Sequence, residues 1–322
     1  MDISPVISAE AASDFKGDVS KIGASLCFFV PISLLISSAI ISAFSSVTAL
    51  NGEQLLVQMQ SGAPYIIYTL ISAVLPLVFC IGFMLKLLKQ HLSPLSLKPS
   101  VDSSAFVYYV AIGILSIPVS AIVANLTHSV LEGFNVKTSS LSAPQGTAET
   151  VCFFIVFAIL IPILEEILFR FAILERLRRY GDVSAIIISA MFFSFAHSSF
   201  QSFPHTFVMG LVLGFVAVKT KSALASIIIH SVNNSFSLVS LIISSSKNVG
   251  SEIRLLGFVI LSVIVAALLI VLGFKGKKGS FNFEFRGKEI RALRKASLVF
   301  TNFWVILFII ISVSYAFVSI SI

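Results

Sequence analysis

Long apolar runs separated by short polar gaps dominate this sequence of 322 residues. A helix needs roughly 20 apolar residues to cross the hydrocarbon layer of a bilayer, and most of the runs reach that length. Strands of a membrane barrel would instead alternate apolar and polar residues along segments of about 10 residues. With 57% hydrophobic and 11% charged residues, the chain also has too few polar side chains to cover a soluble domain. The sequence therefore predicts an all-α, polytopic transmembrane helical bundle.

The predicted spans, about 8–9 in number, cover residues 22–48, 65–88, 105–126, 150–174, 183–200, 205–219, 222–246, 255–274 and 297–321. All but four of the 22 lysine and arginine residues then fall on one side of the membrane. The exceptions are Lys137, Lys247, Arg254 and Arg170, of which Arg170 lies inside a span. Because cytoplasmic loops retain lysine and arginine, this bias predicts a cytoplasmic N-terminus. Topology thus accounts for the net charge of +7, and no nucleic acid partner is expected.

Two adjacent glutamates interrupt the fourth predicted span, "ILIPILEEILFRFAIL" at residues 159–174. A charge in the bilayer interior costs at least about 2.5–3.5 kcal/mol, so an intramembrane carboxylate indicates a functional site. Glu166 and Arg170 are four residues apart on one helix face, in the order that favours an ion pair. Glu165 lies about 100° away around the helix, so it is expected to point elsewhere. Pro162 removes a backbone hydrogen bond one turn earlier and is expected to kink the helix and admit water to Glu165.

Two histidines also lie inside predicted spans, His197 in the fifth and His230 in the seventh. His230 and Asn234 are four residues apart and share a helix face, and Phe193 has the same spacing to His197. At 1.5 Å per residue, Glu165, His197, His230 and Asn234 lie about 16, 22, 13 and 20 Å from the cytoplasmic ends of their spans. A single histidine in an apolar helix is usually structural, whereas several polar groups at one level indicate a shared site.

A carboxylate, two imidazoles and a carboxamide around one cavity can hydrolyse a peptide bond without a serine or cysteine nucleophile. Glu165 together with His197 could accept a proton from a water molecule. His230 and Asn234 could then donate hydrogen bonds to the oxyanion of the tetrahedral intermediate. Alternatively, Glu165, His197 and His230 could bind a divalent metal ion such as zinc, which would activate the water. The residues alone leave both mechanisms open.

Other catalytic designs and other functions fit the sequence less well than peptide hydrolysis at this site. The HExxH and GxSG motifs and an aspartate inside a predicted span, on which other intramembrane proteases depend, do not occur in this sequence. An ion- or proton-coupled transporter is an alternative, because intramembrane carboxylates and histidines also line transport pathways. The polar residues cluster at one level, however, and do not form a path across the membrane. A further alternative is an inactive scaffold or immunity protein of the same fold, although every candidate residue is present.

Three motifs, in this order along the chain, resemble those of the CPBP intramembrane proteases, also called the Abi family, which includes the CAAX prenyl endopeptidases. They are EExxxR, FxxxH and HxxxN, formed here by Glu165, Glu166 and Arg170, by Phe193 and His197, and by His230 and Asn234. The resemblance covers about residues 150–240. It implies that Glu165 is the general base with His197 assisting, and that the remaining residues stabilise the oxyanion or support the site. It leaves open whether a metal is required.

The sequence departs from the family pattern at two positions. Phe171 follows Arg170 where the family commonly has a glycine, and Lys221 stands in the turn before the third motif, where a glycine is often found. We expect Phe171 to affect the choice of substrate more than the catalytic residues. Gly210 and Gly214 form a GxxxG face, which predicts close helix packing.

The resemblance also suggests a division of the chain and a class of partner. Residues 1–149 would form N-terminal transmembrane helices, residues 150–240 the protease core, and residues 241–322 C-terminal transmembrane helices with a basic cytoplasmic loop. The expected substrate is a membrane-embedded or lipid-anchored protein or peptide, which meets the site within the lipid bilayer. A bacterial cytoplasmic membrane is the expected location.

Overall fold

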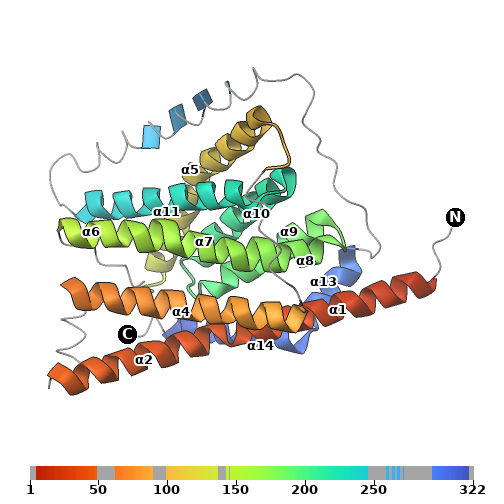
Figure 1. Ribbon diagram of the computed structural model, residues 1–322, viewed down its shortest axis with the longest axis horizontal. Helices are drawn as coiled ribbons and strands as arrows, with labels where there is room; N and C mark the ends of the chain where they lie inside the picture. The colour runs from red at the N-terminus through yellow and green to blue at the C-terminus, as the bar shows by residue number, and fades with distance from the viewer. Residues whose placement is uncertain are drawn as a thin grey trace.

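The computed structural model describes residues 5–48, 62–89, 99–136, 143–144, 146–245 and 292–318, together with short stretches between 259 and 271. Helices are the only regular structure in these residues, as the sequence predicts. In chain order they are α1 (Pro5–Cys27), α2 (Phe29–Thr48), α4 (Gly62–Leu88), α5 (Ser103–Gly133), α6 (Thr147–Phe153), η1 (Phe154–Leu160), α7 (Ile161–Glu166), η2 (Ile167–Leu174), α8 (Glu175–Arg178), α9 (Asp182–Ala196), α10 (Phe203–Thr220), α11 (Ala223–Ser245), α13 (Ala292–Phe300) and α14 (Phe303–Val318), where η marks a π-helix (Figure 1).

The described helices include 6 that are long and apolar enough to cross a membrane, at Ala9–Ser46, Ile66–Leu88, Ser103–Gly133, Thr147–Arg178, Phe203–Thr220 and Ala223–Ser245. The bent pair of α13 and α14 brings the number to 7 if it counts as one span. α9, predicted as a span over 183–200, has only 15 residues. It is therefore shorter than the length that usually crosses a bilayer. Most of the predicted span at 255–274 lies outside the described residues.

The first helical run begins well before residue 22, where the sequence placed the start of the first span. α1 starts at Pro5 and buries one face of the helix. Its buried apolar residues follow one another at spacings of three and four, as expected for one side of a helix; they are Ala12, Phe15, Val19, Ile22 and Leu26, each at most 4% exposed. α1 packs on α4 and α14, so the N-terminal segment is part of the bundle.

The helices form layers in which the run from α6 to α8 is central. α4 lies between this run and the run of α1 and α2, and α11 lies on the opposite side (Figure 1). α10 packs against α5, α9 and α11. A Cβ atom on Gly210 would lie 2.9 Å from Ala190, and one on Gly214 would lie 3.2 Å from Ile186. The missing side chains therefore let α10 approach α9 closely, which confirms the packing role predicted for the GxxxG face.

A cluster of charged and polar groups, which we call the polar latch, joins α1 and α13 to the turn between α8 and α9. Asp18 of α1, only 3% exposed, accepts hydrogen bonds from Arg176 (3.0 and 2.9 Å), from Arg179 and from the Tyr180 hydroxyl (2.9 Å). Lys295 of α13 donates to the Tyr180 carbonyl oxygen. Burial and the hydrogen bond to Asp18 raise the pKa of Tyr180. Hydrogen bonds thus connect α1 and α13 to the same turn between α8 and α9.

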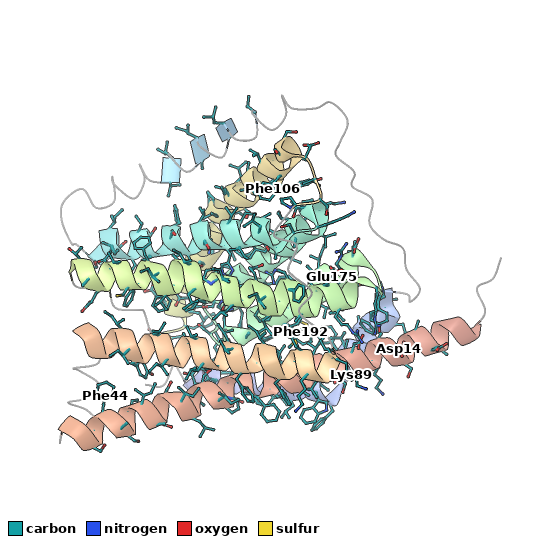
Figure 2. The ribbon with its side chains drawn as sticks, viewed as in Figure 1. Asp14, Phe44, Lys89, Phe106, Glu175 and Phe192 are labelled. Carbon is teal, nitrogen blue, oxygen red and sulfur yellow. The ribbon has the colours of Figure 1, made fainter. Side chains whose placement is uncertain are left out.

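The polar latch lies toward one end of the bundle. Figure 2 shows Asp14, Lys89 and Glu175 toward this end, and Phe44 toward the other. The lysine and arginine bias predicts that this end faces the cytoplasm.

The last helical segment is bent, whereas the sequence predicted one span over 297–321. α13 and α14 meet at 64°. The Asn302 side-chain oxygen accepts hydrogen bonds from the backbone N–H groups of Trp304 (3.1 Å) and Val305 (3.4 Å). An asparagine in this position caps the start of a helix. The helix therefore begins anew after Asn302, and the bend has a local cause.

Candidate active site

The two candidate glutamates stand in a helical run that changes its hydrogen-bond pattern twice. The π-helix η1 precedes the short α7, which ends at Glu166, and the π-helix η2 follows it. In a π-helix each N–H bonds to the carbonyl five residues earlier, and such segments are frequent at functional sites. The Ile161 N–H bonds to the Val156 carbonyl in this way. The next donor would be residue 162, and because Pro162 has no N–H the π pattern stops there. Pro162 thus ends η1 without interrupting the run, which continues as one candidate span.

The side chain of Asn234 in α11 donates a hydrogen bond to the backbone carbonyl that the missing N–H of Pro162 leaves without its π-helical donor. The carbonyl five residues before Pro162 belongs to Phe157, and Asn234 Nδ2 donates to it at 2.9 Å. A carboxamide nitrogen carries two hydrogens, so one remains for another acceptor. The bond fixes the orientation of Asn234 and joins α11 to η1.

Glu166 and Arg170 form the buried ion pair that the sequence predicts. Their side chains are 0% and 1% exposed, and Arg170 Nε lies 3.1 Å from Glu166 Oε2. The two groups are close enough for an ion pair, but they are not aligned for a hydrogen bond. The Nη atoms of Arg170 also have no hydrogen-bond partner among the described residues. The guanidinium carbon lies 4.8 Å from the centre of the Phe193 ring, which places the cation over an aromatic face. Arg170 therefore compensates the charge of Glu166 inside the bundle.

His230 of α11 lies between the two glutamates. Its Nδ1 is 2.9 Å from Glu166 Oε1, and its Nε2 is 3.5 Å from Glu165 Oε2. The carboxylate of Glu166, ionised beside Arg170, can only accept a hydrogen bond, so Nδ1 of His230 carries a hydrogen. Glu165 is 14% exposed, whereas Glu166 is fully buried. Of the two carboxylates, Glu165 is thus the one with free surface.

Phe193 connects His197 to the rest of the site. Its ring makes edge contacts with His197 at 4.8 Å and with His230 at 5.6 Å between ring centroids. The contact with His197 is the one that their spacing predicts. His197 Nδ1 is 2.8 Å from the Phe193 carbonyl oxygen. Because a carbonyl can only accept, Nδ1 is the donor, and the neutral ring leaves Nε2 as an acceptor.

Glu165 was expected to act with His197 on one water molecule, which remains a prediction. The printed contact of the Glu165 carboxylate is with His230. Across the described part of the chain, no hydrogen bond or ion pair joins His197 to Glu165. The physical reason is that His197 follows the last residue of α9 and turns back to a carbonyl of its own helix, one of the terminal carbonyls that lack a helical partner.

The residues suggested as metal ligands do not form a ligand set in this arrangement. Within the described ranges, no three His, Cys, Asp or Glu side chains converge so as to hold a metal ion. Both ring nitrogens of His230 face carboxylates.

Sequence reasoning missed three connections of the site. These are the bond between Glu166 and His230, the bond from Asn234 to the Phe157 carbonyl, and the polar latch at the end of the same helical run. The first two join residues 64 and 77 positions apart, so no local spacing could indicate them. The apolar spacing of α1 could have indicated that Asp18 belongs to a packed helix.

The backbone conformation of Lys221 bears on one departure from the family pattern. It ends α10 in the left-handed conformation, with φ 50° and ψ 35°. Glycine adopts this conformation without a steric cost, which accounts for the glycine often found there in the family. Lys221 therefore holds a backbone shape suited to glycine.

A family comparison covers the region that holds these residues. Residues 147–236 match the model of the family described as type II CAAX prenyl endopeptidase Rce1-like. This segment belongs to the CAAX protease family. The CAAX protease segment runs from α6 into α11 and contains all the candidate catalytic residues. No curated protein and no solved structure matches the chain.

The match and the apolar helices together define the protein in general terms. It is an integral membrane protein with a peptidase segment of the intramembrane CAAX type. Proteases of this family act on membrane-associated substrates in a lipid bilayer.

Proposed function

We propose that this protein is an intramembrane endopeptidase in which Glu165 activates the attacking water, and that its substrate is a membrane-embedded or lipidated peptide. One observation carries the proposal. Glu166 is compensated by Arg170 at 3.1 Å and by His230 at 2.9 Å, whereas the adjacent Glu165 is 14% exposed. The two neighbouring carboxylates therefore have different environments. The environment of Glu166 suits a structural role, and that of Glu165 suits catalysis.

In the first step Glu165 accepts a proton from water as the water oxygen attacks the carbonyl carbon of the scissile peptide bond. His197 assists, because its Nε2 is free to accept a hydrogen bond from the same water and so to orient it. General base catalysis of this kind contributes typically 10²–10⁴-fold to the rate. The attack places a negative charge on the former carbonyl oxygen.

His230 and Asn234 then stabilise that oxyanion. Glu166 accepts a hydrogen bond from Nδ1 of His230 and so fixes the ring. Nε2 of the protonated ring, 3.5 Å from Glu165 Oε2, becomes available to the oxyanion when Glu165 takes up the proton from water. Asn234 donates its second amide hydrogen. Each such donor is worth roughly 10²–10³ in rate. When the tetrahedral intermediate collapses, the C–N bond breaks and the leaving amine takes the proton that Glu165 had accepted.

Substitution of Glu165 tests the assignment of the base. The protein is reconstituted in lipid vesicles with fluorogenic peptides that carry a prenylated cysteine, an acylated cysteine or an apolar transmembrane segment. Glu165→Gln should lower kcat by about 10² or more on whichever peptide the parent protein cleaves. Glu175→Gln is the matched control, because Glu175 lies in the same helical run with its side chain 51% exposed.

The outcomes separate the functions. Normal cleavage by Glu165→Gln would show that Glu165 is not the base. If no peptide is cleaved and the vesicles instead show an ion flux that this substitution abolishes, the protein is a transporter.

A metal requirement is tested on the same samples. Because both nitrogens of His230 face carboxylates, we expect cleavage to continue in the presence of a chelator and the active protein to contain less than one metal ion per chain. Activity that is lost in the chelator and restored by zinc would contradict this expectation.

A further inference from the structure

The short helix α13 presents an apolar face away from the bundle. It packs on α1 near the polar latch (Figure 1). Leu293 is 87% exposed and Phe300 is 58% exposed, and their spacing of seven residues places them on one side of the helix. Lys295 and Val299 lie on a different side and are buried, and Lys295 donates a hydrogen bond to the Tyr180 carbonyl oxygen. The bundle therefore fixes the rotation of α13, with Leu293 and Phe300 pointing outward.

The level of α13 relative to the membrane follows from its contacts. A Cβ atom on Gly23 of α1 would lie 2.9 Å from Val305 N and 3.1 Å from Trp304 Cβ, so α14 begins at the level of Gly23. Tryptophan is enriched at the membrane–water boundary, which assigns this level to the boundary. Asp18 precedes Gly23 by five residues, about 7.5 Å along the helix. Because the headgroup layer is about 5–8 Å thick, the polar latch lies among the headgroups.

The bend before α14 keeps α13 in the same layer. The two helices meet at 64°, so α13 does not continue in the direction of α14. A helix with one apolar face that runs near the boundary can insert this face into the upper part of the acyl chains while its polar side stays among the headgroups. The exposure of Leu293 and Phe300 agrees with this placement.

Positive charge exceeds negative charge where α13 meets the polar latch. Asp18 binds both Arg176 and Arg179, and neither arginine makes another ion pair within the described chain, so one positive charge remains. Arg179 is 43% exposed. Arg294 of α13 is also exposed and makes no ion pair with any described residue. Arg179 and Arg294 each stand next to one member of the hydrogen bond that joins α13 to the turn, so the two cations lie on neighbouring parts of the surface.

We propose that Arg179, Arg294 and the apolar face of α13 form a binding site for an anionic phospholipid of the leaflet on the latch side. The guanidinium groups bind the phosphate, because their planar forks match its oxygens. A zwitterionic lipid gains less, because its own cation already compensates its phosphate. Leu293 and Phe300 contact the upper acyl chains of the same lipid. The positive end of the bundle is the one expected to face the cytoplasm, where leaflets are rich in anionic lipid.

The site does not depend on the proposed peptidase activity. It bears on the helical run that holds Glu165, because Arg179 lies just after the end of this run. A bound headgroup would hold that end of the run at the membrane surface.

Quenching by brominated lipids tests the site directly. Trp304→Phe removes the single tryptophan, and Ser297→Trp places a reporter between Leu293 and Phe300 on the exposed side of α13. The variant is reconstituted in phosphatidylcholine vesicles that contain either brominated phosphatidylcholine or brominated phosphatidylglycerol at equal fraction. Both lipids should quench the reporter, and phosphatidylglycerol should quench it more strongly. Because a cation near the surface contributes about fivefold in affinity, Arg294→Gln should lower the preference for phosphatidylglycerol about fivefold.

Controls separate this site from the general charge of the protein. Lys219→Gln is the matched control, because Lys219 is a cation in the last turn of α10, which packs against α5, α9 and α11. It should change the preference by less than about twofold. A second reporter, Ile122→Trp on the exposed side of α5 in the same Trp304→Phe background, should show no preference beyond about twofold. Arg179→Gln should act as Arg294→Gln does, and thermal unfolding verifies that both variants fold.

Four results would overturn the proposal. The reporter on α13 is quenched by neither brominated lipid, or it is quenched equally by both. Arg294→Gln leaves the preference unchanged, or lowers it no more than Lys219→Gln does. Inorganic phosphate abolishing the preference would also count against the proposal, because the arginines would then bind a free anion and not a lipid.

Discussion

Replacing Glu166 with glutamine should destabilise the protein far more than the same change at Glu165, although the residues are adjacent. Glu166 and Arg170 are 0% and 1% exposed and 3.1 Å apart. Glu165 is 14% exposed, and its carboxylate lies 3.5 Å from Nε2 of His230. Glu166→Gln therefore leaves the Arg170 cation buried without its counter-charge, whereas Glu165→Gln removes a longer and more solvated contact.

The expected magnitude follows from the geometry of the buried pair. At an effective dielectric constant of about 20, charges 3.1 Å apart attract each other by about 5 kcal/mol. Removal of one partner from a buried ion pair typically costs about 3–5 kcal/mol. We expect Glu166→Gln to lower the free energy of unfolding by about 3–5 kcal/mol and Glu165→Gln to lower it by less than about 1 kcal/mol.

Unfolding in detergent, followed by circular dichroism and by the fluorescence of the single tryptophan, Trp304, measures both changes. The double variant Glu166→Gln, Arg170→Met removes both charges and should recover most of the stability, because replacing a whole buried pair is often neutral. Equal destabilisation by the two glutamine variants would refute this reasoning. A double variant less stable than Glu166→Gln alone would refute it as well.

The remaining predictions concern backbone shape and close packing, and thermal unfolding measures each of them. Lys221→Gly should stabilise the protein by up to about 1 kcal/mol, because relief of the left-handed strain (roughly 1–2 kcal/mol) exceeds the gain in unfolded-chain entropy. Lys219→Gly, within α10, should instead destabilise it by about 1 kcal/mol. If both variants stabilise the protein, or both destabilise it, the left-handed conformation of Lys221 is not strained as described. Gly210→Ala should cost about 1–3 kcal/mol, because its Cβ would lie 2.9 Å from Ala190. Gly82→Ala is the control, because its Cβ would meet no atom within 4 Å, and it should stabilise the protein by about 0.5–1 kcal/mol. A Gly210→Ala variant as stable as the parent protein would show that the contact between α10 and α9 is loose.

Features determined by local sequence were predictable. The spans at 65–88 and 222–246 agree with α4 and α11 to within a few residues, because each run has no Asp, Glu or Pro that would end it and is apolar over most of its length, although α4 contains Pro76. The pairing of Glu166 with Arg170 followed from their spacing of four residues and from the cost of burying either charge alone. The fold class needed no more than the length and number of the apolar runs.

Features that depend on three-dimensional packing were not predictable in this way. The start of α1 was missed because acidic residues lie between its apolar positions and lower the average hydropathy, although the spacing of its buried face was present. The site around His230 depends on how α11 is rotated against α7. The role of Asn234 could be recognised only once the π-helix before Pro162 was known. The bend before α14 did have a local signal, because Asn302 precedes an apolar run as a helix cap does.

The polar latch bears on attempts to reduce the protein to its catalytic part. Residues 147–236 contain Arg176 and Arg179, but the carboxylate that binds them is Asp18 of α1. An excised fragment would carry two uncompensated arginines at the tip of its active-site helix, next to a turn that has lost its neighbours on both sides. A minimal enzyme built from this protein should therefore keep the first helix, and a transplant of the segment into another scaffold should include an acidic residue at the equivalent place.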